Sequence, residues 1–442
     1  MGFVNTESAS SVMTRSGSGV LNVVIAGLAL FSDGYNVQII GYMEPLCSIF
    51  IFVVKARLSN LFLIGVLIDR MGRRTGVIAA TSFSVLGVAL AAAAHGTSEL
   101  GMFQMMIISR GIAGFGAGGE YPVCATSATE AADETARLRK KRGFLVALTT
   151  DFAIAIGFIS ASITALIVLA CFSQQTREGV WRVCFDIGFV LPIVVCFFRI
   201  RMINLTQYRK HAIKRKYPYR LVLKRYWKPM LGTFLGWVLY DFVVYNFGLF
   251  SSTIISQLNP DNSTVQNIGY GVINSFYLPG CLLGGVLMDR IGRKQTMTLG
   301  FLLWSIWGFI LGGALNLIQP VFSLFIIMYG IFNALGEMGP GVSTFLCASE
   351  SFPTPLRGHF LGPAAAAGNA GASIGAEVFR PVQRSFGDVR EGQRGVFLTA
   401  SGFTLLGGVV AWWLILYMEM ELESEDTRFM VYLVEHGYEY DS

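Results

Sequence analysis

Apolar stretches long enough to cross a lipid bilayer recur along almost the whole of this 442-residue chain. A membrane-spanning helix needs about 20 mostly apolar residues. Only 14% of the residues are charged, whereas a soluble protein has about a quarter, so a soluble enzyme or a secreted protein is excluded. Hydropathy predicts eleven spans, at residues 20–43, 76–95, 101–125, 144–172, 180–200, 230–256, 267–288, 296–318, 320–347, 359–383 and 396–418.

A strongly basic segment divides the chain into halves. From Arg199 to Lys228 there are eleven Lys or Arg and no Asp or Glu, which is typical of a cytoplasmic loop. The net charge of +6 therefore indicates which side of the membrane the loops face, and no nucleic-acid partner is predicted. We expect both termini on the cytoplasmic side. The predicted organisation is a tail at 1–19, a helix bundle at 20–200, a basic linker at 201–229, a second bundle at 230–418 and a tail at 419–442.

The two halves carry an internal repeat. Residues 65–74 (GVLIDRMGRR) and 285–294 (GVLMDRIGRK) share one pattern at an offset of 220, which indicates duplicated halves. Asp33 and Asp241 pair at an offset of 208 instead, so the first half lacks twelve residues. The twelfth candidate span, between Arg57 and Asp69, is correspondingly too short to cross a bilayer. We expect nominally twelve helices with the second shortened.

Neither a metal centre nor a catalytic site is predicted. The seven cysteines are scattered singly, with no CxxC pair, which argues against a zinc site or a disulfide framework. No spacing of nucleophile and base is evident. We therefore expect no cofactor and no enzymatic activity, and the sequence leaves the oligomeric state open.

The two DRxGR loops resemble those of the major facilitator superfamily. Residues 31–36 (FSDGYN) and 118–122 (GGEYP), with the Trp237–Asp241–Tyr245 spacing, are similar to its phosphate:proton symporter branch. Residues 38–45 (QIIGYMEP) and 349–358 are most similar to fungal glycerophosphoinositol permeases. The resemblance implies an all-helical fold of two six-helix bundles related by pseudo-symmetry, with the substrate bound between them.

Asp241 is the leading candidate for the transport site. Trp237 lies one helical turn before it and Tyr245 one turn after it, so the three side chains share one helix face. A carboxylate within the membrane is costly and usually functional. The resemblance implies a substrate-binding and proton-coupling role. Uptake of a proton by Asp241 would lower its repulsion of an anionic phosphodiester.

The first half supplies further candidates. The resemblance implies proton transfer by Asp33 and Arg110, and substrate binding by Glu120 and Tyr121. Pro122, next to this pair, removes a helix hydrogen bond within the membrane. Two simpler readings stay open: a helix-cap or turn role for Asp33 beside Gly34, and a structural ion pair for Arg110.

The DRxGR loops are predicted to act as gates. Their aspartates can accept hydrogen bonds from arginines or cap helix ends, stabilising one conformation and releasing in the other. They are not expected to touch the substrate. The predicted gating residues are Asp69, Arg70, Arg73, Asp289, Arg290 and Arg293.

One position departs from the symporter branch. Where that branch usually has a lysine, residues 366–372 read AAGNAGA, with Asn369 at the lysine position. Asn369 can still donate a hydrogen bond to a phosphate oxygen, but without the charge-assisted part of the contact. Arg380, further along the same span, could supply charge from a different depth.

Together these features predict proton-coupled import of a glycerophosphodiester, glycerophosphoinositol or glycerophosphocholine, at the plasma membrane. The expected partners are this small anionic substrate, protons and the lipid bilayer. Two alternatives stay open: a transporter of inorganic phosphate or another small solute, and a non-transporting paralogue or nutrient sensor.

Overall fold

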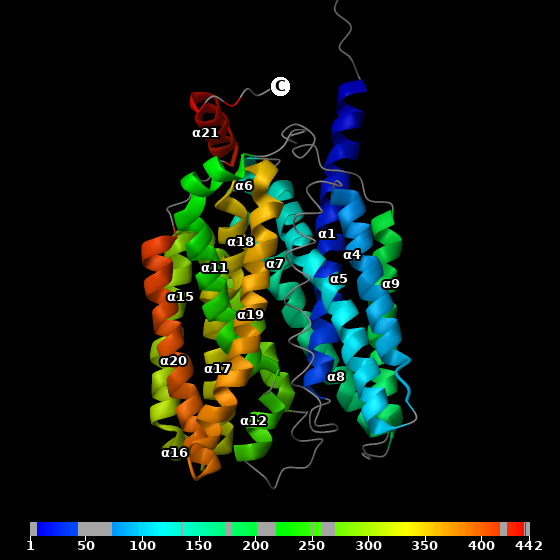
Figure 1. The fold of residues 1–442 in the computed structure, drawn as a ribbon, viewed down its shortest axis with the longest axis vertical. Helices are drawn as coiled ribbons and strands as arrows, with labels where there is room; N and C mark the ends of the chain where they lie inside the picture. Colours follow the sequence, from blue (N-terminus) through cyan, green and yellow to red (C-terminus); the bar gives the residue numbers. More distant parts are fainter. Residues whose placement is uncertain are drawn as a thin grey trace, which may run out of the picture.

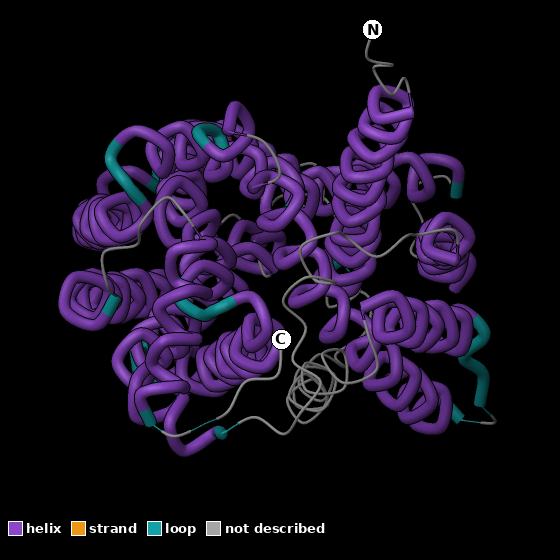
Figure 2. Tube along the Cα trace, turned by 90° about the horizontal axis from the view of Figure 1, so that it is seen from above, coloured by secondary structure: helices purple, strands orange, loops and turns teal. Residues whose placement is uncertain are grey.

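In the described part of the chain, every regular element is a helix, and the long helices lie side by side in two groups (Figures 1 and 2). The computed structural model describes residues 7–42, 73–96, 98–133, 136–172, 178–200, 218–249, 251–258, 270–415, 422–436 and 438. The first group contains α1 (Glu7–Gly41), α4 (Arg73–Ala92), α5 (Glu99–Asp133), α6 (Ala136–Arg139), α7 (Arg142–Thr149), α8 (Asp151–Cys171) and α9 (Glu178–Ile200).

The second group follows the basic segment. It contains α11 (Tyr219–Leu249), α12 (Ser251–Leu258), the 3₁₀ helix η1 (Tyr270–Phe276), α14 (Tyr277–Arg290), α15 (Arg293–Gly313), α16 (Leu315–Ile318), α17 (Phe322–Gly336), the π-helix η2 (Glu337–Gly341), α18 (Val342–Glu350), η3 (Thr354–Leu356), α19 (Arg357–Arg384), α20 (Val389–Leu414) and α21 (Leu422–Glu435). We call the end of the molecule at which α1 begins and α21 lies, at the top of Figure 1, the terminal end.

All eleven predicted spans coincide with helices of the structure. Within the described ranges, seven helical segments are long and apolar enough to cross a membrane by themselves. The shortened twelfth candidate, between Arg57 and Asp69, lies outside the described residues. The prediction of an all-helical membrane fold is confirmed.

The helices place apolar side chains outward and polar side chains inward. Ile108, Ile167 and Trp413 are each more than half exposed on outer helix faces. Asp33, Glu120 and many Ser and Thr side chains are buried. In water this distribution would be unfavourable, but in a bilayer the outer faces contact acyl chains while backbone polar groups are satisfied within each helix.

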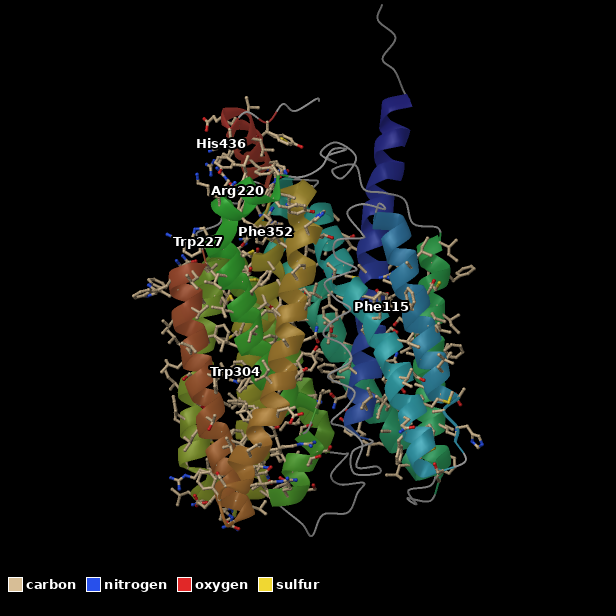
Figure 3. The ribbon with its side chains drawn as sticks, in the orientation of Figure 1. Phe115, Arg220, Trp227, Trp304, Phe352 and His436 are labelled. Carbon is tan, nitrogen blue, oxygen red and sulfur yellow. The ribbon has the colours of Figure 1, made fainter. Side chains whose placement is uncertain are left out.

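Each half has its own aromatic core. In the first, Tyr35 packs with Trp181 and Phe185. In the second, Trp304, which Figure 3 shows near the middle of the bundle, packs on Phe332 with ring centroids 5.4 Å apart. The second core also reaches Ala125 and Ala155 of the first half, so the two halves pack against each other in this conformation.

The sequence repeat appears in space as a direct contact. The hydroxyl oxygens of Thr129 on α5 and Ser349 on α18 lie 3.0 Å apart, and the two residues are 220 positions apart. Residues related by a pseudo-two-fold axis meet only where they lie close to that axis. Thr129 and Ser349 therefore mark where the two halves adjoin.

Two helices extend into segments predicted as linker and tail. α11 begins at Tyr219, so the last part of the predicted 201–229 linker is helical. α21, in the predicted tail, packs Phe429 and Leu433 against Tyr226 and Phe352. Asp426 of α21 accepts hydrogen bonds from the backbone N–H and hydroxyl of Thr354, at 2.6 and 2.7 Å. Figure 3 shows Phe352, Arg220 and His436 together at this end.

Close packing of α11 on α19 gives a first prediction. A Cβ at Gly371 of α19 would collide with the carbonyl of Val238 on α11. We expect Gly371→Ala to destabilise the protein by about 1–3 kcal/mol, the usual cost of overpacking, seen as a lower melting temperature of the purified protein in detergent. Gly402→Ala on α20, where no atom lies within 4 Å of the added Cβ, is the matched control. An equal melting temperature for the two variants would contradict this account.

Candidate functional site

A cavity lies between the two halves. Its volume is about 610 Å³, its open side included. Helices α5 and α8 of the first half and α11, α14, α18, α19 and η2 of the second contribute to its wall. The described lining residues are Tyr121, Asp151, Ile154, Ala155, Phe158, Trp237, Tyr240, Asp241, Val244, Tyr245, Gly248, Leu249, Tyr277, Glu337, Phe345, Ala365 and Asn369.

Five residues predicted for substrate binding lie around this one cavity. Trp237, Asp241 and Tyr245 reach it from α11, because their four-residue spacing places them on one helix face. Tyr121 reaches it from α5 and Asn369 from α19. The hydroxyl oxygens of Tyr121 and Tyr245 lie 3.4 Å apart and so join the two halves across the cavity.

Aromatic packing fixes the orientation of these side chains. The ring of Tyr121 stacks on Phe345, with centroids 5.6 Å apart. Trp237 meets the same Phe345 edge to face at 4.8 Å. The Asn369 amide donates to the carbonyl of Ala365, one turn earlier on its own helix, at 3.0 Å. These contacts hold the two rings and the amide in the wall of the cavity.

Two further carboxylates line the cavity. Asp151, at the first position of α8, accepts a hydrogen bond of 3.0 Å from the Thr150 hydroxyl. Glu337 accepts one of 2.7 Å from Tyr240 and lies 3.8 Å from the Cys281 sulfur. Sequence reasoning missed Glu337. The signal for Glu337 was its place as an acid inside the apolar span at 320–347.

The local backbone at Glu337 is unusual. η2, which Glu337 begins, is a five-residue π-helix that contains Pro340. Proline has no N–H to donate and clashes with a regular helical turn before it, so the chain widens here instead of continuing as an α-helix. π segments of this kind commonly lie at functional sites.

Glu120 does not line the cavity; it lies in a polar cluster inside the first half. Its carboxylate pairs with Arg199 of α9 at 2.5 Å and accepts a hydrogen bond of 2.9 Å from Thr81 of α4. Asp33 of α1 interacts electrostatically with the same guanidinium. Sequence reasoning counted Arg199 as the first residue of the basic segment Arg199–Lys228, although it falls inside the apolar span at 180–200.

Arg110 lies elsewhere in the first half. Its guanidinium donates to the carbonyl of Asn36 on α1 at 3.1 Å. It also lies 4.3 Å from the ring centroid of Phe185, a cation–π geometry. Arg110 thus ties α5 to α1 and α9.

Near the terminal end, buried ionic contacts join the two halves. Arg142, the first residue of α7, donates to Glu350 of α18 at 2.6 Å. Arg293 of α15 donates to the same carboxylate at 3.0 and 3.3 Å. Asp289 of α14 accepts from the backbone N–H groups of Gly143 and Phe144, at 2.8 and 3.0 Å. A carboxylate at a helix N-terminus is stabilised by the otherwise unpaired amides there.

The second DRxGR loop thus lies at an interface between the halves. Asp289 and Arg293 take part in the contacts just described, whereas Arg290 is exposed. Gly292 has φ of +95°, a left-handed conformation that glycine adopts without strain. Of the first loop, Asp69 and Arg70 lie outside the described residues, as does the side chain of Arg73. Arg142 and Glu350 were not among the predicted gating residues.

On the side of the cavity away from the terminal end, the two halves meet through apolar contacts. Val37 of α1 packs against Leu249 of α11, with Phe158 and Tyr245 around them. Phe158 also meets Tyr277 edge to face, with centroids 6.1 Å apart. The cavity therefore lies between an ionic contact toward the terminal end and an apolar contact toward the other end.

Comparison with known proteins gives a family match. The profile described as Major Facilitator Superfamily matches residues 8–376. Two relatives are glycerophosphoinositol permease 1 of Candida albicans, 35% identical, and glycerophosphoinositol transporter 1 of Saccharomyces cerevisiae, 36% identical. Each alignment covers 95% of this chain, and 82% and 83% of the relatives. A third, glycerophosphocholine permease GIT4 of Candida albicans, is 30% identical over 93% of this chain and 81% of its own length.

Solved structures show the same fold. The proton:xylose symporter XylE, bound to 6-bromo-6-deoxy-D-glucose, superposes with a TM-score of 0.76. The match covers 93% of this chain and 99% of XylE at 17% sequence identity.

Proposed function

The chain belongs to the major facilitator superfamily, and from that premise we propose that it imports glycerophosphodiesters, together with protons, across the plasma membrane. The fold and the family indicate a membrane transporter rather than an enzyme. The substrate, the proton coupling and the direction of transport are the proposal.

One observation above all supports this proposal. Trp237, Asp241 and Tyr245 of the second half, and Tyr121 of the first, surround a single cavity between the halves. This is where a carrier of this fold must bind its solute, because only a site between two mobile bodies can be exposed to each side in turn. Relatives named as carriers of glycerophosphoinositol and glycerophosphocholine support the substrate class.

The proposed mechanism uses the two contacts between the halves as alternate gates. Opening the apolar contact at Val37 and Leu249 would admit the substrate from outside. Breaking the ionic contact among Arg142, Glu350, Arg293 and Asp289 would release it inside. With the basic linker placed in the cytoplasm, the terminal end faces inward and both termini are cytoplasmic. Arg290, and Asp69, Arg70 and Arg73 of the first loop, are proposed to act with this gate.

Asp241 is proposed to carry the coupled proton. It lines the cavity, so its charge acts directly on whatever binds there. In the first half, Asp33 and Arg110 are proposed to assist proton transfer, and Glu120 to contribute through its pair with Arg199.

The test is uptake of labelled glycerophosphocholine and glycerophosphoinositol by cells that lack their own permeases. Uptake is measured at acid and neutral pH and divided by the amount of protein at the cell surface. We expect uptake above that of empty-vector cells and higher at acid pH. Surface protein without uptake of either compound would overturn the proposal. Inorganic phosphate is added as a competitor, and its transport in preference to both diesters would do the same.

A further inference from the structure

The charged residues in the described wall of the cavity are all acids. Asp151, Asp241 and Glu337 reach it from α8, α11 and η2, and all three are buried. Among the described lining residues there is no Lys, Arg or His. Asn369 lines the wall where the symporter branch has a lysine, and Arg380 of the same helix is not in the described lining.

This charge pattern is poorly matched to an anion. Where water is largely excluded, an ionised carboxylate strongly repels an added negative charge and attracts a positive one, and a protonated carboxylate gives an anion no positive partner. Protonation of one carboxylate lowers the repulsion without supplying a cation. Glycerophosphoinositol carries one net negative charge, on its phosphate, and has no positive group to face Asp151 or Glu337.

Seven aromatic residues complete the wall. Phe158 and Tyr121 come from the first half, and Trp237, Tyr240, Tyr245, Tyr277 and Phe345 from the second. The faces of aromatic rings attract cations, and groups of such rings recognise quaternary ammonium ions. Carboxylates beside aromatic faces form the chemistry expected for a choline-like head group.

The cavity also retains a hydrogen-bond donor for a phosphate oxygen. The Tyr277 hydroxyl is buried and lines the cavity, and it has no hydrogen-bond partner among the described residues. A buried hydroxyl without a partner is unfavourable in the empty protein, and a phosphodiester oxygen can accept from it. Asn369 lies in the same wall.

From this arrangement we infer that the cavity selects a zwitterionic glycerophosphodiester with a quaternary ammonium head group, such as glycerophosphocholine, over the anionic glycerophosphoinositol. The acids and rings hold the ammonium group, and the hydroxyl and amide donors face the phosphate. The inference rests on the proposed function, because it names the substrate of that same site.

The direct test compares the two labelled diesters at equal concentration and neutral pH, where more of the wall carboxylates are ionised, in permease-deficient cells expressing the full chain. We expect uptake of glycerophosphocholine to exceed that of glycerophosphoinositol at least tenfold. Equal or preferred uptake of glycerophosphoinositol would overturn the inference and leave the proposed function intact. Surface protein that transports neither compound would overturn both.

Two variants test the residues. Glu337→Gln should lower uptake of glycerophosphocholine and reduce its preference over glycerophosphoinositol at least fivefold. Phe158→Leu keeps an apolar side chain at a partly buried position and should reduce the preference in the same direction, even if Glu337→Gln fails to reach the surface. Phe309→Leu, on an exposed part of α15, is the matched control and should leave the preference unchanged. An unchanged preference in Phe158→Leu would count against recognition by the rings.

Discussion

Asp241→Asn is expected to abolish acid-stimulated uptake while the amount of protein at the cell surface stays the same. Asparagine has nearly the same shape, so packing of α11 against its neighbours is retained. It cannot bind and release a proton, so the cavity keeps one fixed charge state throughout the transport cycle. We expect uptake at acid pH to fall at least tenfold, to the level measured at neutral pH.

Uptake of labelled glycerophosphocholine between acid and neutral pH, divided by surface-labelled protein, is the measurement. Asp388→Asn is the matched control, because Asp388 is exposed in the turn before α20. It should keep the full pH dependence. Normal acid stimulation in Asp241→Asn would exclude Asp241 as the proton carrier and leave its role in substrate binding to be tested separately.

Glu350→Gln is expected to destabilise the whole transporter. Glu350 accepts from both Arg142 and Arg293, and all three side chains are buried. Removing its charge leaves two buried guanidinium groups without this partner. Loss of one member of a buried ion pair costs about 3–5 kcal/mol, so we expect a much lower melting temperature in detergent and little surface protein.

Arg142→Gln separates stability from gating. It leaves Glu350 paired with Arg293 inside the second half, so the melting temperature should fall much less than in Glu350→Gln. The ion pair between the halves is lost, so the terminal end should open to water more often. A cysteine placed between the halves near this end should therefore react faster with a water-soluble thiol reagent. Arg220→Gln, exposed on α11 at the same end of the molecule, should change neither property. Equal stability of Glu350→Gln and Arg220→Gln would contradict the role of this network.

The fold and much of the cavity could be predicted from the sequence because their signals are local. A run of apolar residues must become a helix in a bilayer, and four-residue spacing within one helix places Trp237, Asp241 and Tyr245 on one face. Both deductions need only helix geometry and hydropathy. The DRxGR motif also marked Asp289 and Arg293, which the structure places at an interface between the halves.

The residues that were missed depend on contacts between distant segments. Glu350 and Arg142 are 208 positions apart, and nothing in either local sequence identifies the other as its partner. Arg199 was grouped with the basic residues that follow it, although it turns inward to Glu120. Glu337 is the single acid of the apolar span at 320–347, and the high average hydropathy of that span did not draw attention to it. Which acid lines the cavity and which forms an ion pair is decided by how helices are rotated in the bundle.

A single membrane span, Phe322–Glu350, carries both Glu337 of the cavity and Glu350 of the ionic contact. They are thirteen positions apart, about 20 Å along a helix, and the π-helix lies at the cavity end of that interval. A π segment holds one residue more than an α-helical turn. If the π segment changes to an α-helical turn, the extra residue leaves that turn. The helix after it, α18, then rotates by about 100° about its axis. This rotation would move Glu350 away from Arg142. A change at Glu337 in the cavity would then break the ionic contact through rotation of α18.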